Sequence, residues 1–160
     1  GEGTTFEVHL PAVEGDSSGR GHGDASVPAA VPRGRGELVL VVDDEEAVRR
    51  SVRLALEGHG YRVVAAAHGR DGIAQLAEHR GDVALVVTDL MMPVMGGAAM
   101  VAAMRHSAPG LPAIGMTGLT DQSASAEALG MSALLPKPFS RVALLEAVHA
   151  ALAGTRADRA

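Results

Sequence analysis

The chain has 160 residues and a formal net charge of −5, a balance that argues against a nucleic-acid-binding protein, which shows a basic patch or stripe. It has no cysteine, which excludes disulfides, thiolate metal sites and cysteine nucleophiles. No apolar run approaches the roughly 18 residues of a membrane helix, and no signal peptide is visible. We therefore expect a cytoplasmic location, with neither nucleic acid nor membrane as a partner.

The sequence divides into four parts. Residues 1–12 contain an alternation of apolar and polar side chains that predicts one strand with a buried face. Residues 13–36 are rich in Gly, Ser, Pro and Arg and predict a flexible linker, because they have little to bury. Residues 37–153 predict a globular domain, and we expect residues 154–160 to form a disordered tail.

Strand and helix periodicities alternate through the globular domain. Short apolar runs predict five strands, at residues 37–42, 61–66, 83–88, 111–116 and 132–135. Apolar residues at helical spacing predict a helix after each strand, around residues 48–56, 73–77, 100–104, 120–129 and 140–152. The fourth helix is weak because its faces carry mostly Ala and Ser, and Ser140 is a candidate cap for the last helix. This order predicts an α/β fold, a doubly wound five-stranded parallel sheet with five helices covering both faces.

Polar side chains follow four of these strands. Asp43 and Asp44 come after the first strand, Asp89 after the third, Thr117 after the fourth and Lys137 after the fifth. The carboxyl ends of parallel strands line one edge of an open sheet, where ligands bind. Three carboxylates, a hydroxyl and an ammonium gathered there would bind a divalent cation and handle a phosphoryl group.

Each of these residues has an ordinary structural interpretation when taken alone. Asp43 and Asp44 could cap the following helix, and a threonine or lysine at a strand end is common. The phosphoryl interpretation depends on their coincidence at successive strand ends of one sheet.

The motifs that contain these residues resemble the receiver domain of two-component response regulators. They read Val-Val-Asp43-Asp44, Asp89-Leu-Met-Met-Pro-Val-Met-Gly-Gly, Met-Thr117-Gly and Pro-Lys137-Pro-Phe. The resemblance covers residues 37–153 and implies the flavodoxin-like receiver fold. One departure is Leu134, which stands where the family often has an aromatic residue.

The resemblance implies a Mg²⁺ site. In it, Asp44, Asp89 and the backbone carbonyl of Met91 would bind the ion directly, and Asp43 would act through water.

The resemblance also implies a phosphorylation site. Asp89 would accept a phosphoryl group from a phosphohistidine, and Thr117 and Lys137 would contact the phosphoryl oxygens. In this role the chain takes part in its own phosphorylation but turns over no separate substrate.

The first eleven residues, Gly-Glu-Gly-Thr-Thr-Phe-Glu-Val-His-Leu-Pro, have a resemblance of their own. They are similar to the closing glycine box and last strand of the ATP-binding domain of histidine kinases. This order of segments implies the receiver of a hybrid histidine kinase. Its implied partners are a phosphohistidine donor domain, in cis or in trans, and a histidine phosphotransfer protein. The sequence leaves open whether two receivers dimerise.

Three alternatives accompany this interpretation. The first is a stand-alone response regulator receiver, and the second is a pseudo-receiver that acts only as a binding surface. The third is a Mg²⁺-dependent phosphohydrolase with Asp89 as its nucleophile. Enzymes of that haloacid-dehalogenase-like class usually place a second Asp two residues after the first, and this chain has Met91 there.

Overall fold

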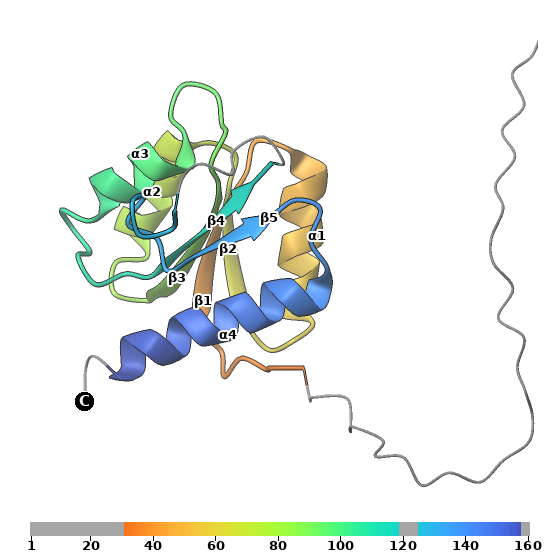
Figure 1. Ribbon diagram of the computed structural model, residues 1–160. Helices are drawn as coiled ribbons and strands as arrows, with labels where there is room; N and C mark the ends of the chain where they lie inside the picture. Colours follow the sequence, from red (N-terminus) through yellow and green to blue (C-terminus); the bar gives the residue numbers. More distant parts are fainter. Residues whose placement is uncertain (1–30, 119–124, 158–160) are drawn as a thin grey trace, which may run out of the picture.

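The computed structural model describes residues 31–118 and 125–157, which form a five-stranded parallel sheet between two layers of helices (Figure 1). The strand order across the sheet is β2-β1-β3-β4-β5. The strands are β1 (Leu38–Val42), β2 (Arg62–Ala66), β3 (Val83–Asp89), β4 (Ala113–Thr117) and β5 (Ala133–Pro136). The predicted parallel sheet and its five strands are confirmed.

Four helices cover the two faces of the sheet in the described part of the chain. They are α1 (Glu46–Glu57), α2 (Gly69–Glu78), α3 (Gly97–Met104) and α4 (Arg141–Ala157). Helices α1 and α4 pack on one face, and α2 and α3 pack on the other (Figure 1). None of these helices is long and apolar enough to cross a membrane.

The central strands are apolar on both faces because each face has its own core. In β1, Leu40 and Val42 pack toward α2 and α3, whereas Val39 and Val41 pack toward α1 and α4. All four are fully buried. Full burial of a Val or Leu side chain stabilises the folded state by about 1.5–3 kcal/mol. The sheet is therefore held between its helices mainly by aliphatic packing.

The prediction of a fifth helix over residues 120–129 is wrong in its described part. Residues 120–124 lie outside the described residues, and residues 126–130 form a turn. The side chain of Ser125 accepts a hydrogen bond from the backbone N–H of Ala128 at 3.1 Å, which is the geometry of a helix N-cap. Within the described residues the turn follows a cap at Ser125, which lies inside the predicted helix.

A glycine ends this turn almost as soon as it has begun. Gly130 has a φ of +64°, its N–H donates to the carbonyl of Glu127, and the N–H of Met131 donates to the carbonyl of Ala126. These two bonds form a Schellman motif, which terminates helices. A cap and a terminator this close together leave room for a single helical turn.

The last helix starts as predicted and ends later than predicted. The hydroxyl of Ser140 accepts a hydrogen bond from the N–H of Ala143 at 3.1 Å, which confirms its capping role. Helix α4 continues to Ala157, so residues 154–157 belong to the helix and not to a tail. Residues 158–160, the predicted strand in residues 1–12 and most of the predicted linker lie outside the described residues.

The start of α3 packs directly against the carboxyl end of β3. A Cβ atom on Gly97 would overlap the carbonyl oxygen of Asp89 and lie 2.8 Å from the hydroxyl of Thr88. Only a residue without a side chain fits there without moving the strand end. Gly97 thus allows the close approach that fixes the backbone of Asp89.

We expect Gly97→Ala to lower the free energy of unfolding by about 1–3 kcal/mol, because the added methyl group overlaps backbone atoms. The matched control is Gly154→Ala in α4, where a Cβ atom meets nothing within 4 Å. This control should stabilise the protein by roughly 0.5–1 kcal/mol through helix propensity. Urea denaturation measures both changes, and equal effects of the two substitutions would contradict the packing described for Gly97.

Candidate functional site

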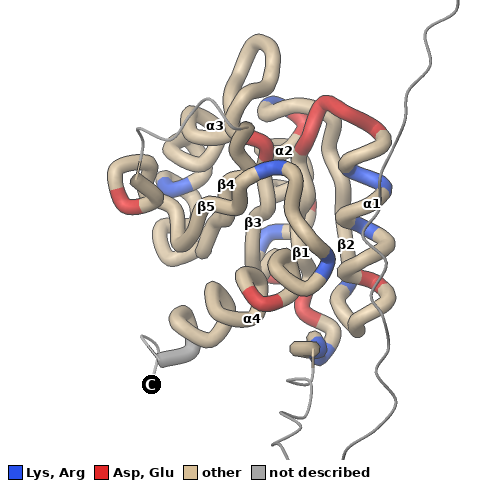
Figure 2. Tube along the Cα trace, turned by 45° about the vertical axis from the view of Figure 1, so that its right-hand side comes forward, with Lys and Arg blue, Asp and Glu red and all other residues tan. Residues whose placement is uncertain are grey.

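Three carboxylates gather at the carboxyl edge of the sheet. Asp43 and Asp44 follow β1, Asp89 ends β3, and one oxygen from each lies within 4.8 Å of the others. Figure 2 shows the acidic positions at this end of the sheet, where α1 begins. Asp43 is 0% and Asp89 7% exposed, whereas Asp44 is exposed. The predicted meeting of these three residues is confirmed.

A lysine bridges the two buried carboxylates. The ammonium of Lys137 donates to Oδ2 of Asp43 at 2.9 Å and to Oδ2 of Asp89 at 3.0 Å. Lys137 is the only lysine in the chain, and its side chain is 22% exposed. Charge-assisted hydrogen bonds of this length are among the stronger polar contacts in proteins. They tie the end of β5 to the ends of β1 and β3.

The same contacts hold Lys137 in its charged form. Burial alone would lower the pKa of Lys137, but the hydrogen bonds and the negative charges of Asp43 and Asp89 outweigh it. The net effect raises its pKa above the ordinary value of 10.5. The ammonium is therefore a permanent cation at neutral pH.

Backbone groups fix the other oxygens of the buried carboxylates. Oδ1 of Asp43 accepts the N–H of Glu45 at 2.8 Å, and Oδ1 of Asp89 accepts the N–H of Met91 at 3.2 Å. Glu45 is the N-cap of α1 and makes no side-chain capping bond. The aspartate thus orders the entry to the helix and faces the lysine at the same time, so the capping and site interpretations of Asp43 are compatible.

Arg49 belongs to the site and was not identified from the sequence. Its guanidinium donates to the backbone carbonyls of Asp43 at 2.7 Å and Asp44 at 3.1 Å. These bonds hold the loop between β1 and α1 without using a carboxylate oxygen. The only signal in the sequence is its position on the first turns of the helix that follows the aspartate pair.

Thr117 lies at the end of β4, next to the lysine strand. The backbone N–H of Lys137 donates to its carbonyl at 2.7 Å, and its own hydroxyl donates to the carbonyl of Gly118 at 2.9 Å. Thr117 therefore lies at the carboxyl edge of the sheet, as predicted, and its hydroxyl is bonded to the neighbouring residue. The side chain of Met91, two residues after Asp89, is 70% exposed beside the site.

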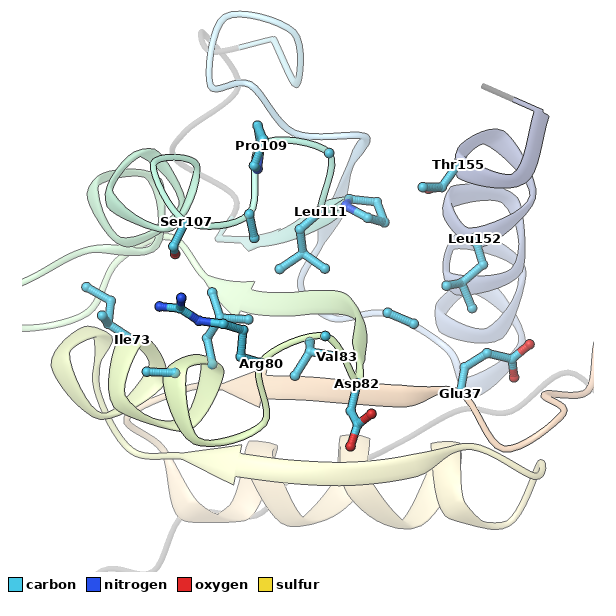
Figure 3. A pocket seen from close by; sticks show the side chains of 17 residues that line it. Glu37, Ile73, Arg80, Asp82, Val83, Ser107, Pro109, Leu111, Leu152 and Thr155 are labelled. Atoms are coloured by element: carbon cyan, nitrogen blue, oxygen red, sulfur yellow. The ribbon is translucent and has the colours of Figure 1, made fainter. Parts of the chain in front are cut away.

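A cavity of about 630 Å³ lies at the opposite, amino edge of the sheet (Figure 3). Its walls are mostly apolar and come from the ends of α2 and α4 and the loop before β4, as Ile73, Leu111 and Leu152 show in Figure 3. None of the residues of the acidic cluster lines it. The cavity is therefore separate from the candidate site.

The charges of the site leave an excess of negative charge. Two carboxylates whose oxygens lie within 4.8 Å of each other repel each other by roughly 3 kcal/mol or more at an effective dielectric constant of 20. Lys137 compensates one of the three negative charges, and the exposed Asp44 has no contact with it among those described. Oxygen ligands arranged in this way suit a hard divalent cation.

Comparisons with known proteins agree with this geometry. A family model described as the response regulator receiver domain matches residues 39–149. The chain is 37% identical over 122 residues to the response regulator MprA of Mycolicibacterium vanbaalenii, covering 75% of this chain and 52% of that protein. It is 34% identical over 147 residues to the sensor kinase CckA of Brucella abortus, covering 88% of this chain and 15% of that protein. The chain thus spans about half or less of these relatives.

A solved structure shows the same architecture. The chemotaxis protein CheY4 of Vibrio cholerae superposes with a TM-score of 0.68 at 31% sequence identity, covering 72% of this chain and 98% of that chain.

The titration of Lys137 gives a direct test of the bridge. In protein labelled only on lysine, one side-chain NMR signal should titrate above pH 10.5, and Asp43→Asn or Asp89→Asn should lower its pKa. The pKa of Lys137 is raised in the folded state. The stability that its contacts with Asp43 and Asp89 contribute is therefore complete below pH 10.5 and is lost as the pH rises through the raised pKa. Asp82→Asn, an exposed carboxylate at the other edge, is the control. An unchanged pKa in the two site variants would contradict the bridge.

Proposed function

Since this chain belongs to the response regulator receiver domain family, we propose that Asp89 accepts a phosphoryl group from a phosphohistidine. The observation that carries this proposal is the bridge from Lys137 to Asp43 and Asp89, with the carboxylate of Asp44 beside it. A partly buried cation in contact with a carboxylate nucleophile is the arrangement that the charge of a transferring phosphoryl group requires.

In the proposed reaction, a carboxylate oxygen of Asp89 attacks phosphorus in line with the histidine nitrogen. A P–O bond to Asp89 forms as the P–N bond breaks, and the electron pair of that bond returns to the imidazole. One oxygen of Asp89 is held by the N–H of Met91 and the other by Lys137. The aspartate is therefore oriented before the donor arrives, and the ammonium lies beside the carboxylate, within reach of oxygens on a phosphoryl group attached there.

Mg²⁺ is the proposed cofactor, and the residues present fit it. Asp44 and Asp89 would bind the ion together with the backbone carbonyl of Met91, and Asp43 would act through water. When bound, the ion would supply positive charge that offsets the carboxylates and the phosphoryl oxygens. The excess negative charge described for the cluster supports this assignment.

Thr117 is proposed to contact the phosphoryl group through its hydroxyl. The hydroxyl donates to the carbonyl of Gly118 in the unphosphorylated chain, so this contact requires rotation of the side chain. Its burial and its position at the end of β4, joined to Lys137 through the backbone, support the role.

We further propose that the receiver belongs to a hybrid histidine kinase. Residues 37–160 make up less than four fifths of the chain, so the alignment with the sensor kinase CckA, which covers 88% of it, extends into the segment before residue 37. The glycine-containing motif of residues 1–11 adds to this support. The donor would be the kinase's phosphohistidine domain, in cis or in trans, and a histidine phosphotransfer protein would be a further partner. The matches to MprA favour a response regulator as the second candidate.

Mass spectrometry after incubation with acetyl phosphate and Mg²⁺ tests the acceptor role. We expect one added phosphoryl group on the full chain and none after chelation with EDTA, because the charge at the site would be uncompensated. Asp89→Asn should abolish the adduct, since the amide cannot replace the carboxylate nucleophile.

The matched control is Asp82→Asn, an exposed carboxylate that follows α2 at the amino edge of the sheet. It should be phosphorylated like the unmodified chain. A folded protein that gains no phosphoryl group, or equal phosphorylation of the Asp89→Asn variant, would refute the proposed function.

A further inference from the structure

We propose that residues 33–37, which include the end of the predicted linker, are docked on the turn between α1 and β2 and form a fixed junction. Any upstream part of the chain would then pivot before Gly34 and not at the start of β1. The inference concerns an interaction surface at the edge of the sheet opposite to Asp89, and it does not depend on phosphorylation.

Backbone hydrogen bonds extend the β1–β2 pairing into this segment. The N–H of Gly34 donates to the carbonyl of His59 at 2.8 Å, and the N–H of Gly36 donates to the carbonyl of Gly60 at 2.9 Å. The N–H of Arg62 donates to the carbonyl of Glu37 at 2.9 Å, directly before the regular pairing of Leu38 with Arg62. Three successive backbone contacts therefore hold a segment that composition alone assigns to a coil.

Two glycines make the close approach possible. A Cβ atom on Gly34 would lie 2.5 Å from the ring of Tyr61, a residue that is 4% exposed and packs in the core beneath α1 and α4. Gly60 has a φ of +87°, and a Cβ atom on it would lie 2.8 Å from the carbonyl oxygen of Gly34. The two backbones thus fit face to face only because both residues lack side chains.

Two side chains make further hydrogen bonds to the backbone of this segment. The guanidinium of Arg62 donates through Nε to the carbonyl of Gly36 at 3.0 Å. The N–H of Arg35 donates to the carboxylate of Glu37 at 2.5 Å. These contacts satisfy the carbonyl of Gly36 and the N–H of Arg35, polar backbone groups that a free linker would leave to water.

The junction lies at the edge of the sheet opposite to the carboxylate cluster. Glu37 lies at the amino edge of the sheet (Figure 3), and Asp89 lies at the far end of β3, roughly 20 Å away for a strand of this length. The chain enters at that edge (Figure 1). If the proposed hybrid kinase is correct, the junction keeps the carboxyl edge open to a donor.

Limited proteolysis of the full chain tests the docking with an internal control. Arg20, Arg33 and Arg35 are each followed by glycine, so trypsin meets a similar bond at all three. Arg20 lies inside the predicted linker, whereas the bonds after Arg33 and Arg35 lie in the docked segment. We expect cleavage after Arg33 and Arg35 to be about tenfold slower than after Arg20, because it requires local opening.

Substitutions then test the cause of this protection. Gly34→Val adds a side chain that overlaps the ring of Tyr61 and should displace the segment. Cleavage after Arg33 and Arg35 should then reach the rate at Arg20, and amide exchange at Gly36 should become faster. The matched control is Gly110→Val, because a Cβ atom on Gly110 meets nothing within 4 Å. Gly110→Val should leave the cleavage rates after Arg33 and Arg35 and the amide exchange at Gly36 unchanged.

A second variant covers the case in which Gly34→Val unfolds the domain. Arg62→Ala removes the contact to Gly36 from an exposed side chain and should raise cleavage after Arg35 by a smaller factor. Circular dichroism serves as the fold check, and this variant should keep the helical signal of the unmodified chain. Equal cleavage at all three arginines in the unmodified chain, or no change in the folded variants, would overturn the proposal.

Discussion

The contact of one ammonium with two buried carboxylates is the interaction on which the site depends. Lys137 reaches Asp43 and Asp89 from the other side of β4, so the contact exists only while four adjacent strands keep their order and register. Buried charges are costly unless they are paired. The aliphatic sheet therefore supplies the stability, and the ion pairs determine which side chains face one another at its carboxyl edge.

Residues near the starts of α1 and α3 fix the backbone that carries these carboxylates. Gly97 lets α3 begin against the carbonyl of Asp89, and Arg49 on α1 holds the carbonyls of Asp43 and Asp44. Neither contact uses a carboxylate oxygen. The backbone is thus fixed by one set of groups while the charged atoms remain available for a cation, a phosphoryl group and the lysine, which is the preorganisation that phosphoryl transfer requires.

Much of this architecture could be predicted from the sequence because strong signals coincide. Five apolar runs with a polar residue after four of them identify the sheet and its functional edge, and Ser140 marks the start of the last helix correctly. The helix predicted over residues 120–129 is wrong in its described part, residues 125–129, because helical periodicity takes no account of the cap at Ser125 and the terminating Gly130. Ser125 and Gly130 together restrict the helix to one turn.

Other features lay beyond sequence reasoning because they arise from tertiary contacts. The contacts of Arg49 depend on the conformation of the loop before α1, which no local pattern reveals. The docking of Gly34 against Tyr61 is the clearest case, since a glycine in a linker-like segment gives no indication of the ring that it faces. The composition of residues 33–37 predicts a coil, but their contacts with the turn between α1 and β2 determine their conformation.

A calorimetric titration with Mg²⁺ of the full chain and of its Asp44→Asn variant tests whether the acidic cluster binds a cation. Asp44 is exposed, so its substitution removes a charge from the cluster without opening the core. We expect binding at a single site and an affinity that falls roughly tenfold or more in the variant, because one of the few carboxylate ligands is lost. Equal affinity in the two proteins, or no binding by the unmodified chain, would contradict the claim that these carboxylates form a site for a cation.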